Sequence, residues 1–386
     1  MKTDLAWRNL LYARGRTLAA TAGVALVATL VFMQIGFFRA LERSATLIYQ
    51  ALEFDLCLRS PDYLRLSDPG SFPYQRLYQA RSAAGVRSAA ALWVGLRLWR
   101  SPQDGQKRPI LVMGIEPQRS VFRHPDLARS VSRLQLPQQV LLDRLTRSEY
   151  GPVNGRSFTE QDVGLAGRYE ISGKPIEVVG LYELGAGFSA NGSVVVSAGG
   201  FERLSERVGR GTVQLGLLQV EAGYAPEQVA RQLRSSLPPD VVVLTRQQVL
   251  DDERDLWVRR TSYGLVFQLG IAVAVSVGAA VVYQILSGDI AALLPEYATM
   301  MAMGYTYKQL VVVILRQGAW LALFGYLPAT AVSYGLYELT RYGAQVPMRF
   351  AVQDATLVAL LTLTMCLISA GFASLRLYRA DPASLY

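Results

Sequence analysis

The chain has 386 residues, of which 51% are hydrophobic and 18% are charged, a balance too apolar for an ordinary soluble enzyme of this length. Its net charge of +9 would suggest a nucleic-acid partner in a soluble protein. Several cations stand directly beside long apolar segments, so a lipid membrane explains the charge better and no nucleic-acid partner is expected.

Four stretches are nearly free of charge and reach the roughly 20 residues that an α-helix needs to cross about 30 Å of hydrocarbon. We expect spans at residues 18–38, 263–287, 309–337 and 355–375. The first stretch could also be a cleaved signal peptide, whose apolar region usually runs about 7–15 residues. It is longer than that and ends in large residues such as Phe37 and Phe38, so a retained span is the better interpretation.

Residues 1–17 carry Trp7, Leu10 and Leu11 at helical spacing, which predicts an interfacial helix. A docking surface for a partner is the other possible function of this helix. Basic residues cluster on the outer flanks of the first and last spans, at Lys2, Arg8, Arg14, Arg16, Arg376 and Arg379. By the positive-inside rule both termini are cytoplasmic and the chain is a multi-pass protein of the inner (plasma) membrane.

This orientation assigns the segments between the spans. Residues 39–262 form a periplasmic domain, 288–308 a cytoplasmic loop, 338–354 a short periplasmic loop and 376–386 a cytoplasmic tail. In the periplasmic segment, alternating apolar residues predict strands that start at Phe54, Ala91, Pro109, Ile176, Ser193, Gln214 and Asp240. The sequence SGKP at Ser172 predicts a hairpin, and Pro226 opens a helix that ends before Pro238. Strands mixed with helices indicate an α+β domain.

A helical run from Gln247 to Arg260 leads into the second span. It could be a stiff stalk that transmits force or a plain solvated connection, and the sequence favours neither. Its acidic residues alternate with basic ones, which predicts a salt-bridged solvent face rather than a catalytic pair; they are Asp251, Asp252, Glu253 and Asp255, beside Arg254 and Arg259.

The sequence lacks the motifs of several catalytic sites. It contains no P-loop, no G-x-S-x-G, no H-E-x-x-H and no C-x-x-C. The one histidine, His124, has no metal-ligating neighbours, and Cys57 and Cys366 are expected to pack as small apolar residues. We therefore expect no catalysis, metal or cofactor in this chain.

The loop between the second and third spans, residues 287–310, predicts a short helix at the membrane surface. Pro295 suits its start, Glu296 its first turn, and Gly304 its end. Tyr297 and the methionines at 300, 301 and 303 offer adaptable contact area for a partner. On composition alone, a lipid-facing connector is the stronger alternative.

The order of the spans, together with this E-Y-A-T-x-x-A-M-G-Y loop, resembles the FtsX/MacB superfamily of ABC-transporter permeases (type VII), and most closely its DevC-like branch. Further matching strings run from the first span to the last residues: FMQIGF at 32–37, D-x-x-L-x-S-P at 55–61, RLYQA at 76–80, SEYGPV at 148–153 and ADP at 380–382. The resemblance therefore extends over nearly the whole chain.

The resemblance implies a homodimeric permease that is moved by a separate DevA-like ATPase, which holds the ATP and Mg. It also implies a DevB-like periplasmic adaptor and a TolC-like outer-membrane channel. The positions that match the coupling motif for the ATPase are Glu296, Tyr297, Ala298, Thr299, Ala302, Met303, Gly304 and Tyr305. Met300 and Met301 stand within it where the branch usually carries Leu-Lys, which removes one possible ion pair with the ATPase.

Two other functions compete with export of a glycolipid or other amphiphile. A mechanotransmitter like the cell-division branch would pass motion to a periplasmic partner. The resemblance to that branch implies an outer domain smaller than the one expected here. A membrane-anchored sensor would need an internal signalling domain, and the expected cytoplasmic segments are too short for one.

Overall fold

The computed structural model describes residues 14–379 except 120, 124, 154, 166, 186–190, 206–210 and 344–345. The interfacial helix expected at residues 1–17 lies largely outside this range, and His124 and the ADP string lie wholly outside it. The chain forms two compact units. One joins the residues up to Ala40 with those from Ser262 onward, and the other is the inserted domain, Leu41–Thr261.

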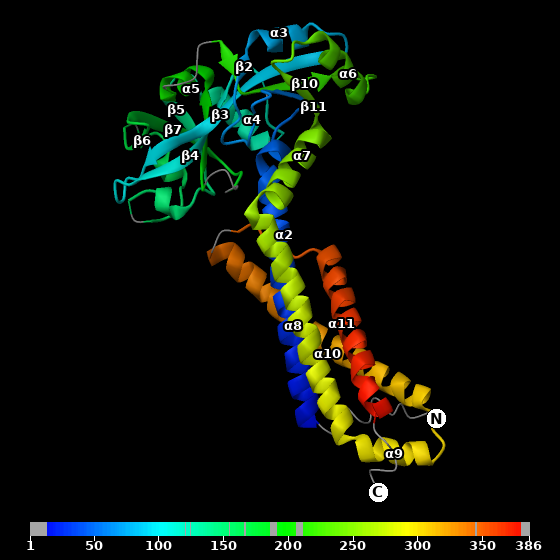
Figure 1. Cartoon of the computed structure of the whole chain (residues 1–386). Helices are drawn as coiled ribbons and strands as arrows, with labels where there is room; N and C mark the ends of the chain where they lie inside the picture. The colour runs from blue at the N-terminus through cyan, green and yellow to red at the C-terminus, as the bar shows by residue number, and fades with distance from the viewer. Residues whose placement is uncertain are drawn as a thin grey trace. The chain divides into compact units, whose positions relative to one another are not determined.

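Four helices of the described residues are long and apolar enough to cross a membrane, as expected. They are α2 (Arg14–Ala51), α8 (Ser262–Ala292), α10 (Tyr307–Gly343) and α11 (Val352–Arg379), and a short helix, α9 (Leu294–Ala302), links α8 to α10 (Figure 1). The 38 residues of α2 extend about 57 Å at 1.5 Å per residue, well beyond the hydrocarbon thickness. Its last residues, from Leu41, therefore belong to the inserted domain.

Small residues let the spans approach closely. A Cβ atom added to Gly278 of α8 would lie 2.2 Å from Val27 of α2 and 2.6 Å from the sulfur of Met365 in α11. A Cβ atom on Gly325 of α10 would lie 2.4 Å from Val24. Any side chain at these two glycines would push the helices apart.

Polar side chains also join the spans through backbone carbonyls. Tyr337 of α10 donates its hydroxyl to the carbonyl of Phe32 at 2.6 Å, and Ser369 of α11 donates to the carbonyl of Ala279 at 2.8 Å. The Nε atom of Arg39 lies 3.0 Å from Oδ1 of Asp354, a nearly buried carboxylate at the start of α11. These bonds fix the spans against one another where apolar packing alone has no direction.

The inserted domain is built on one nine-stranded mixed sheet (Figure 1). In spatial order its strands are β11 (Val242–Thr245), β1 (Leu56–Arg59), β10 (Leu215–Val220), β3 (Val86–Arg100), β4 (Lys107–Ile115), β8 (Ser193–Ser197), β5 (Gln139–Asp143), β7 (Lys174–Tyr182) and β6 (Tyr169–Ile171). The long strand β3 serves two regions: residues up to Leu92 pair with β10, and residues from Leu92 pair with β4. Because β6 also pairs with the end of β3, the second region closes on itself like a barrel.

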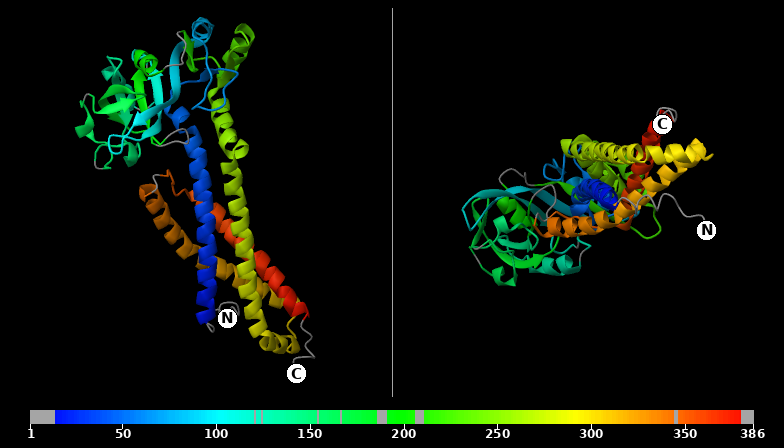
Figure 2. Two further views of the ribbon diagram at one scale, coloured as in Figure 1. Left: turned by 60° about the vertical axis from the view of Figure 1, so that its left-hand side comes forward. Right: turned by 90° about the horizontal axis from the view of Figure 1, so that it is seen from below.

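Shorter elements cover this sheet and its loops (Figure 2). They are β2 (Phe72–Pro73), α3 (Gln75–Arg81), α4 (Pro125–Ser130), η1 (Val131–Arg133), η2 (Ser148–Tyr150), η3 (Glu160–Asp162), α5 (Ala198–Leu204), β9 (Thr212–Val213), α6 (Pro226–Ser236), α7 (Arg246–Asp255) and η4 (Leu256–Arg260). Leu77 of α3 and Leu233 of α6 pack with Leu218 of β10 in one buried cluster. Trp99 and Phe158 lie in another cluster, within the closed region.

All seven strands expected in this domain are present, and so is the helix opened by Pro226. The expected hairpin joins β6 to β7 through Ser172 and Gly173, with φ angles of 51° and 75°. Ile171 pairs with Lys174 across it, so this is a two-residue turn of the type that matches strand twist. Cys57 and Cys366 are free and buried, as expected.

The structure argues against one of the two alternatives for residues 247–260, the continuous stalk, and corrects the solvent face expected for their acidic residues. A continuous stalk is not formed, because α7 changes at Leu256 to the π-helical turn η4, and Thr261 is extended with φ −100° and ψ 154° before α8 begins. The acidic cluster is also not wholly a solvent face. Asp251 and Asp255 do pair with arginines, but Glu253 is only 2% exposed.

Candidate functional site

The short helix α9 begins and ends where its sequence predicts. Pro295 stands in the first helical positions, where its missing N–H is not needed, and Glu296 lies in the first turn near the positive end of the helix dipole. At the other end Gly304 adopts φ +97°. The N–H of Gly304 bonds to the carbonyl of Met301 and that of Tyr305 to the carbonyl of Met300, which is the Schellman pattern of helix termination.

The chain on each side of α9 is also held by local bonds. The N–H of Leu293 donates to the carbonyl of Asp289 at 3.1 Å, so α8 passes into α9 through a single turn. Thr306 precedes α10, and its N–H donates to the Gln309 side chain at 2.9 Å. The helix is therefore held at both ends by short, bonded connections.

One face of α9 packs on the bundle. Tyr297 is 1% exposed and Ala298 is 4% exposed, and both lie in the interior near residues of α10 such as Leu310. Met300 and Met301 are half-buried against the same cluster. In this structure the side chains of Tyr297 and Ala298 are buried and anchor α9 to the spans. Direct contact of these two residues with a partner stays a prediction.

The other face of α9 is exposed. Met303 is 67% exposed and Tyr305 is 44% exposed. The remaining exposed positions of the motif are Glu296, Thr299, Ala302 and Gly304. We call these six positions the α9 face: Glu296, Thr299, Ala302, Met303, Gly304 and Tyr305. It combines one carboxylate with adaptable apolar area, a composition suited to a protein contact.

Two contacts around α9 were not anticipated. The Nε atom of Arg16 in α2 lies 3.6 Å from Oδ1 of Asp289 in α8, and the hydroxyl of Tyr307 in α10 donates to the carbonyl of Ser374 in α11 at 3.1 Å. One contact joins α2 to α8 and the other joins α10 to α11, near the two ends of α9. The signal in the sequence was Asp289, a lone acid beside a long apolar run, since such residues usually have a specific partner.

The described residues include no group of three or more histidine, cysteine or acidic side chains placed to hold a metal ion.

The C-terminal part of the chain matches a known protein family. Residues 269–382 match the family described as FtsX-like permease C-terminal, a segment that starts within α8 and includes α9, α10 and α11. A comparison with curated proteins found no match.

Two solved structures are similar in fold to part of the chain. The periplasmic region of MacB from Actinobacillus actinomycetemcomitans is 9% identical, with a TM-score of 0.35, covering 53% of this chain and 94% of that one. The extracellular domain of the noncanonic ABC-type transporter YknZ from Gram-positive bacteria is 15% identical, with a TM-score of 0.32, covering 50% of this chain and 99% of that one.

The C-terminal part of the chain is thus similar to the FtsX-like permease family, and four described helices are long and apolar enough to cross a membrane.

Proposed function

We propose that this chain is the membrane subunit of an ATP-driven ABC exporter of the DevC-like branch and that it works by mechanotransmission. In this proposal the spans lie in the inner (plasma) membrane, both termini are cytoplasmic, the inserted domain is periplasmic and α9 is cytoplasmic. The basic residues that flank the first and last spans support this orientation.

The observation that carries the proposal is the two-sided structure of α9. Tyr297 and Ala298 fix the helix to the spans, while Met303 and Tyr305 stay exposed beside Glu296. A force applied to the exposed face would pass through the anchored face into α8 and α10. This arrangement suits a contact with a separate DevA-like ATPase, which would hold the ATP and Mg, and it suits a lipid-facing connector less because Glu296 is exposed on the same surface.

Met300 and Met301, which stand where the DevC-like branch usually carries Leu-Lys, are half-buried. Met301 packs partly on the bundle, so a lysine at this position would have to extend its ammonium past the helix to reach a partner. We therefore place the contact with the ATPase mainly on the α9 face.

A homodimer is proposed from the surface of α8. This helix has the least buried span of the four, with 11% of its most apolar window buried. Five of its exposed residues recur at every fourth position and so lie along one side of the helix. They are two glutamines and three small residues: Gln268, Ala272, Ser276, Ala280 and Gln284. Small residues let two helices approach, and amide side chains in lipid gain from a partner across an interface.

For the transported substrate we propose a glycolipid or other amphiphile, delivered with a DevB-like adaptor and a TolC-like outer-membrane channel. The size of the inserted domain, Leu41–Thr261, supports export. The second candidate is an FtsX-like mechanotransmitter that regulates a periplasmic partner. Either function leaves ATP hydrolysis to the partner ATPase, in keeping with the lack of a P-loop in this sequence.

A pull-down of the tagged full-length chain in mild detergent tests the proposal. We expect a P-loop ATPase subunit to copurify with the unmodified chain, and Met303→Glu together with Tyr305→Ala to remove most of it while the chain stays folded. Leu323→Ala, on an exposed part of α10, is the matched control and should retain the ATPase. Failure of the unmodified chain to bring down any ATPase would contradict the proposal.

A further inference from the structure

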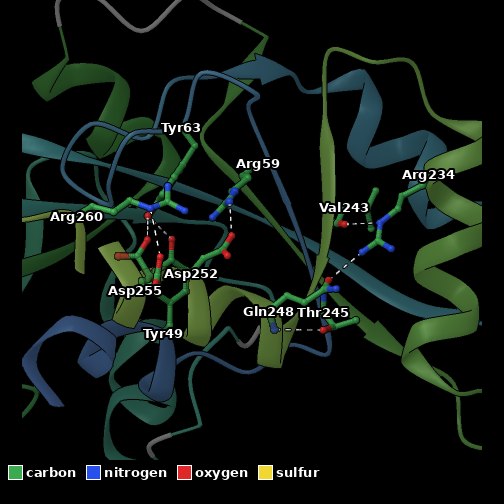
Figure 3. Close-up of polar contacts among 11 residues, drawn as sticks. Tyr49, Arg59, Tyr63, Arg234, Val243, Thr245, Gln248, Asp252, Asp255 and Arg260 are labelled. Carbon is green, nitrogen blue, oxygen red and sulfur yellow. Dashed lines mark hydrogen bonds and ion pairs between the residues drawn. The ribbon is translucent and has the colours of Figure 1, made fainter. Parts of the chain in front are cut away.

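Within the inserted domain, two buried side chains, Tyr49 and Glu253, and the half-buried Tyr63 form a chain of hydrogen bonds between α2 and α7. The hydroxyls of Tyr49 in α2 and Tyr63 lie 2.8 Å apart, and Tyr63 in turn donates to Oε1 of Glu253 in α7. Tyr49 is 1% exposed and Glu253 is 2% exposed. Figure 3 shows Tyr49 and Tyr63 near the C-terminal end of α7, which carries Asp252 and Asp255. The carboxyl group of Glu253 has thus been removed from water and is held by a phenol.

The arginines around Glu253 form ion pairs with other acidic residues. Arg59 of β1 directs Nη2 to Oδ2 of Asp252 at 2.7 Å, and its guanidinium lies 4.6 Å from the centre of the Tyr63 ring (Figure 3). Asp255, one turn along α7, pairs with Arg260 at 3.3 Å. Cys57 of β1 faces the cluster as a buried neutral thiol.

Burial is the largest influence on this carboxyl and raises the pKa of Glu253 to about 7. The hydrogen bond from Tyr63 and the charge of Arg59 act in the opposite direction, and the charge of Asp252 raises the pKa further. Burial also raises the pKa of Tyr63 well above its ordinary value, so this phenol remains a donor. Near neutral pH, Glu253 therefore passes between a neutral and a charged form inside a site that disfavours the charge.

The beginning of α7 is held by groups that do not titrate near neutral pH. The guanidinium of Arg246 donates to the carbonyl of Leu52 at 2.9 Å and to that of Tyr49 at 3.2 Å, and it stacks on Phe54. Thr245 and Gln248 form a reciprocal capping box, visible in Figure 3.

The end of α7 has a different attachment. Glu253 lies two turns after Arg246, in the last turn of α7, which is followed by the π-helical turn η4 and then by the extended residue Thr261. Protonation of Glu253 can thus alter how the end of α7 is held without releasing its beginning.

We propose that Tyr49, Tyr63 and Glu253 form a proton-dependent latch, closed when Glu253 is neutral, that holds the end of α7 against α2. When the carboxyl ionises, the buried charge must gain water or move toward Arg59, and either change weakens the attachment of α7. The latch is a property of the inserted domain and does not rest on the proposed function. If the chain does transmit motion, opening of the latch at alkaline pH would make the segment leading into α8 more mobile.

Hydrogen exchange of the full-length chain in detergent, followed by mass spectrometry and corrected for the intrinsic rate at each pH, tests this inference. Between about pH 5.5 and about pH 8.5 we expect the protection of residues 251–260 to fall about tenfold or more, with a midpoint near 7. Glu253→Gln keeps an acceptor for Tyr63 but cannot ionise, so its protection should stay constant over this range.

Two further variants keep the test decisive. Arg59→Gln removes the cation that lowers the pKa of Glu253, so it should shift the midpoint to higher pH even if Glu253→Gln fails to fold. Asp251→Asn, an exposed acid of the same helix that bonds to Gln247, should leave the midpoint unchanged. The latch would be overturned by wild-type protection that does not vary with pH, by an equal pH dependence in Glu253→Gln, or by an unmoved midpoint in Arg59→Gln.

Discussion

The Nε atom of Arg16 lies 3.6 Å from Oδ1 of Asp289, which joins the start of α2 to the end of α8 beside α9. Both side chains are partly exposed, at 48% and 24%, so water screens much of the attraction. We expect Asp289→Asn to lower the free energy of unfolding by less than about 1 kcal/mol. Denaturant unfolding in detergent would measure this. A loss above about 3 kcal/mol would show a buried pair instead.

The close contact at Gly278 makes a second prediction. Gly278→Ala would bring a methyl group within 2.2 Å of Val27, so we expect a loss of about 1–3 kcal/mol in bundle stability. Gly288→Ala in the same helix meets nothing within 4 Å and is the matched control. Thermal unfolding in detergent should separate the two, and Val27→Ala should partly restore the Gly278→Ala variant. Equal melting temperatures for the two alanine variants would contradict the packing described above.

Local sequence patterns were sufficient for much of the fold. The four spans, seven strands and the limits of α9 follow from hydrophobic periodicity, from Pro295 and from Gly304, all of which act within a few residues. The strand β5 (Gln139–Asp143) is not predicted by the sequence, because its short apolar run cannot be told from part of a buried helix by periodicity alone. The strand β6 (Tyr169–Ile171) is expected only as the first arm of the hairpin at Ser172.

The burial of particular side chains could not be predicted, because it depends on distant parts of the chain. Glu253 stands among three other acids in the sequence, and its environment is set in part by Tyr63, 190 positions away. Tyr297 matches a surface motif, and its burial depends on residues of α10 such as Leu310. Periodicity identifies which face of a helix is apolar, but it does not identify which polar residue a loop will cover.

The proposed dimer predicts contacts along α8. A single cysteine at Ser276, in a background with Cys57 and Cys366 replaced, should form a disulfide between two copies in native membranes. A cysteine at Leu323 of α10, also exposed, should not. Ala280→Leu should reduce cross-linking at Ser276, because a large side chain separates the helices. Efficient cross-linking at Leu323 and none at Ser276 would place the interface elsewhere.

The buried carboxyl of Glu253 predicts a pH dependence of stability. Its pKa rises from 4.5 to about 7 on folding, so the protonated form stabilises the folded state below about pH 4.5, and this contribution is lost as pH rises through 7. The full change corresponds to at most about 3 kcal/mol. Unfolding of the wild type and Glu253→Gln should therefore differ in pH dependence, with the wild type losing relative stability between about pH 5 and about pH 8. Parallel stability curves for the two proteins would contradict the raised pKa.

The proposed function requires that the α9 face contacts a separate ATPase. A photo-cross-linking amino acid at Met303, which is 67% exposed, tests it most directly in living cells, with the same group at Leu323 as the control. We predict one strong adduct from position 303 that contains a P-loop ATPase, and no such adduct from position 323. If position 303 gave only lipid adducts, or the same products as position 323, α9 would be a membrane-surface connector and the proposed coupling would be wrong.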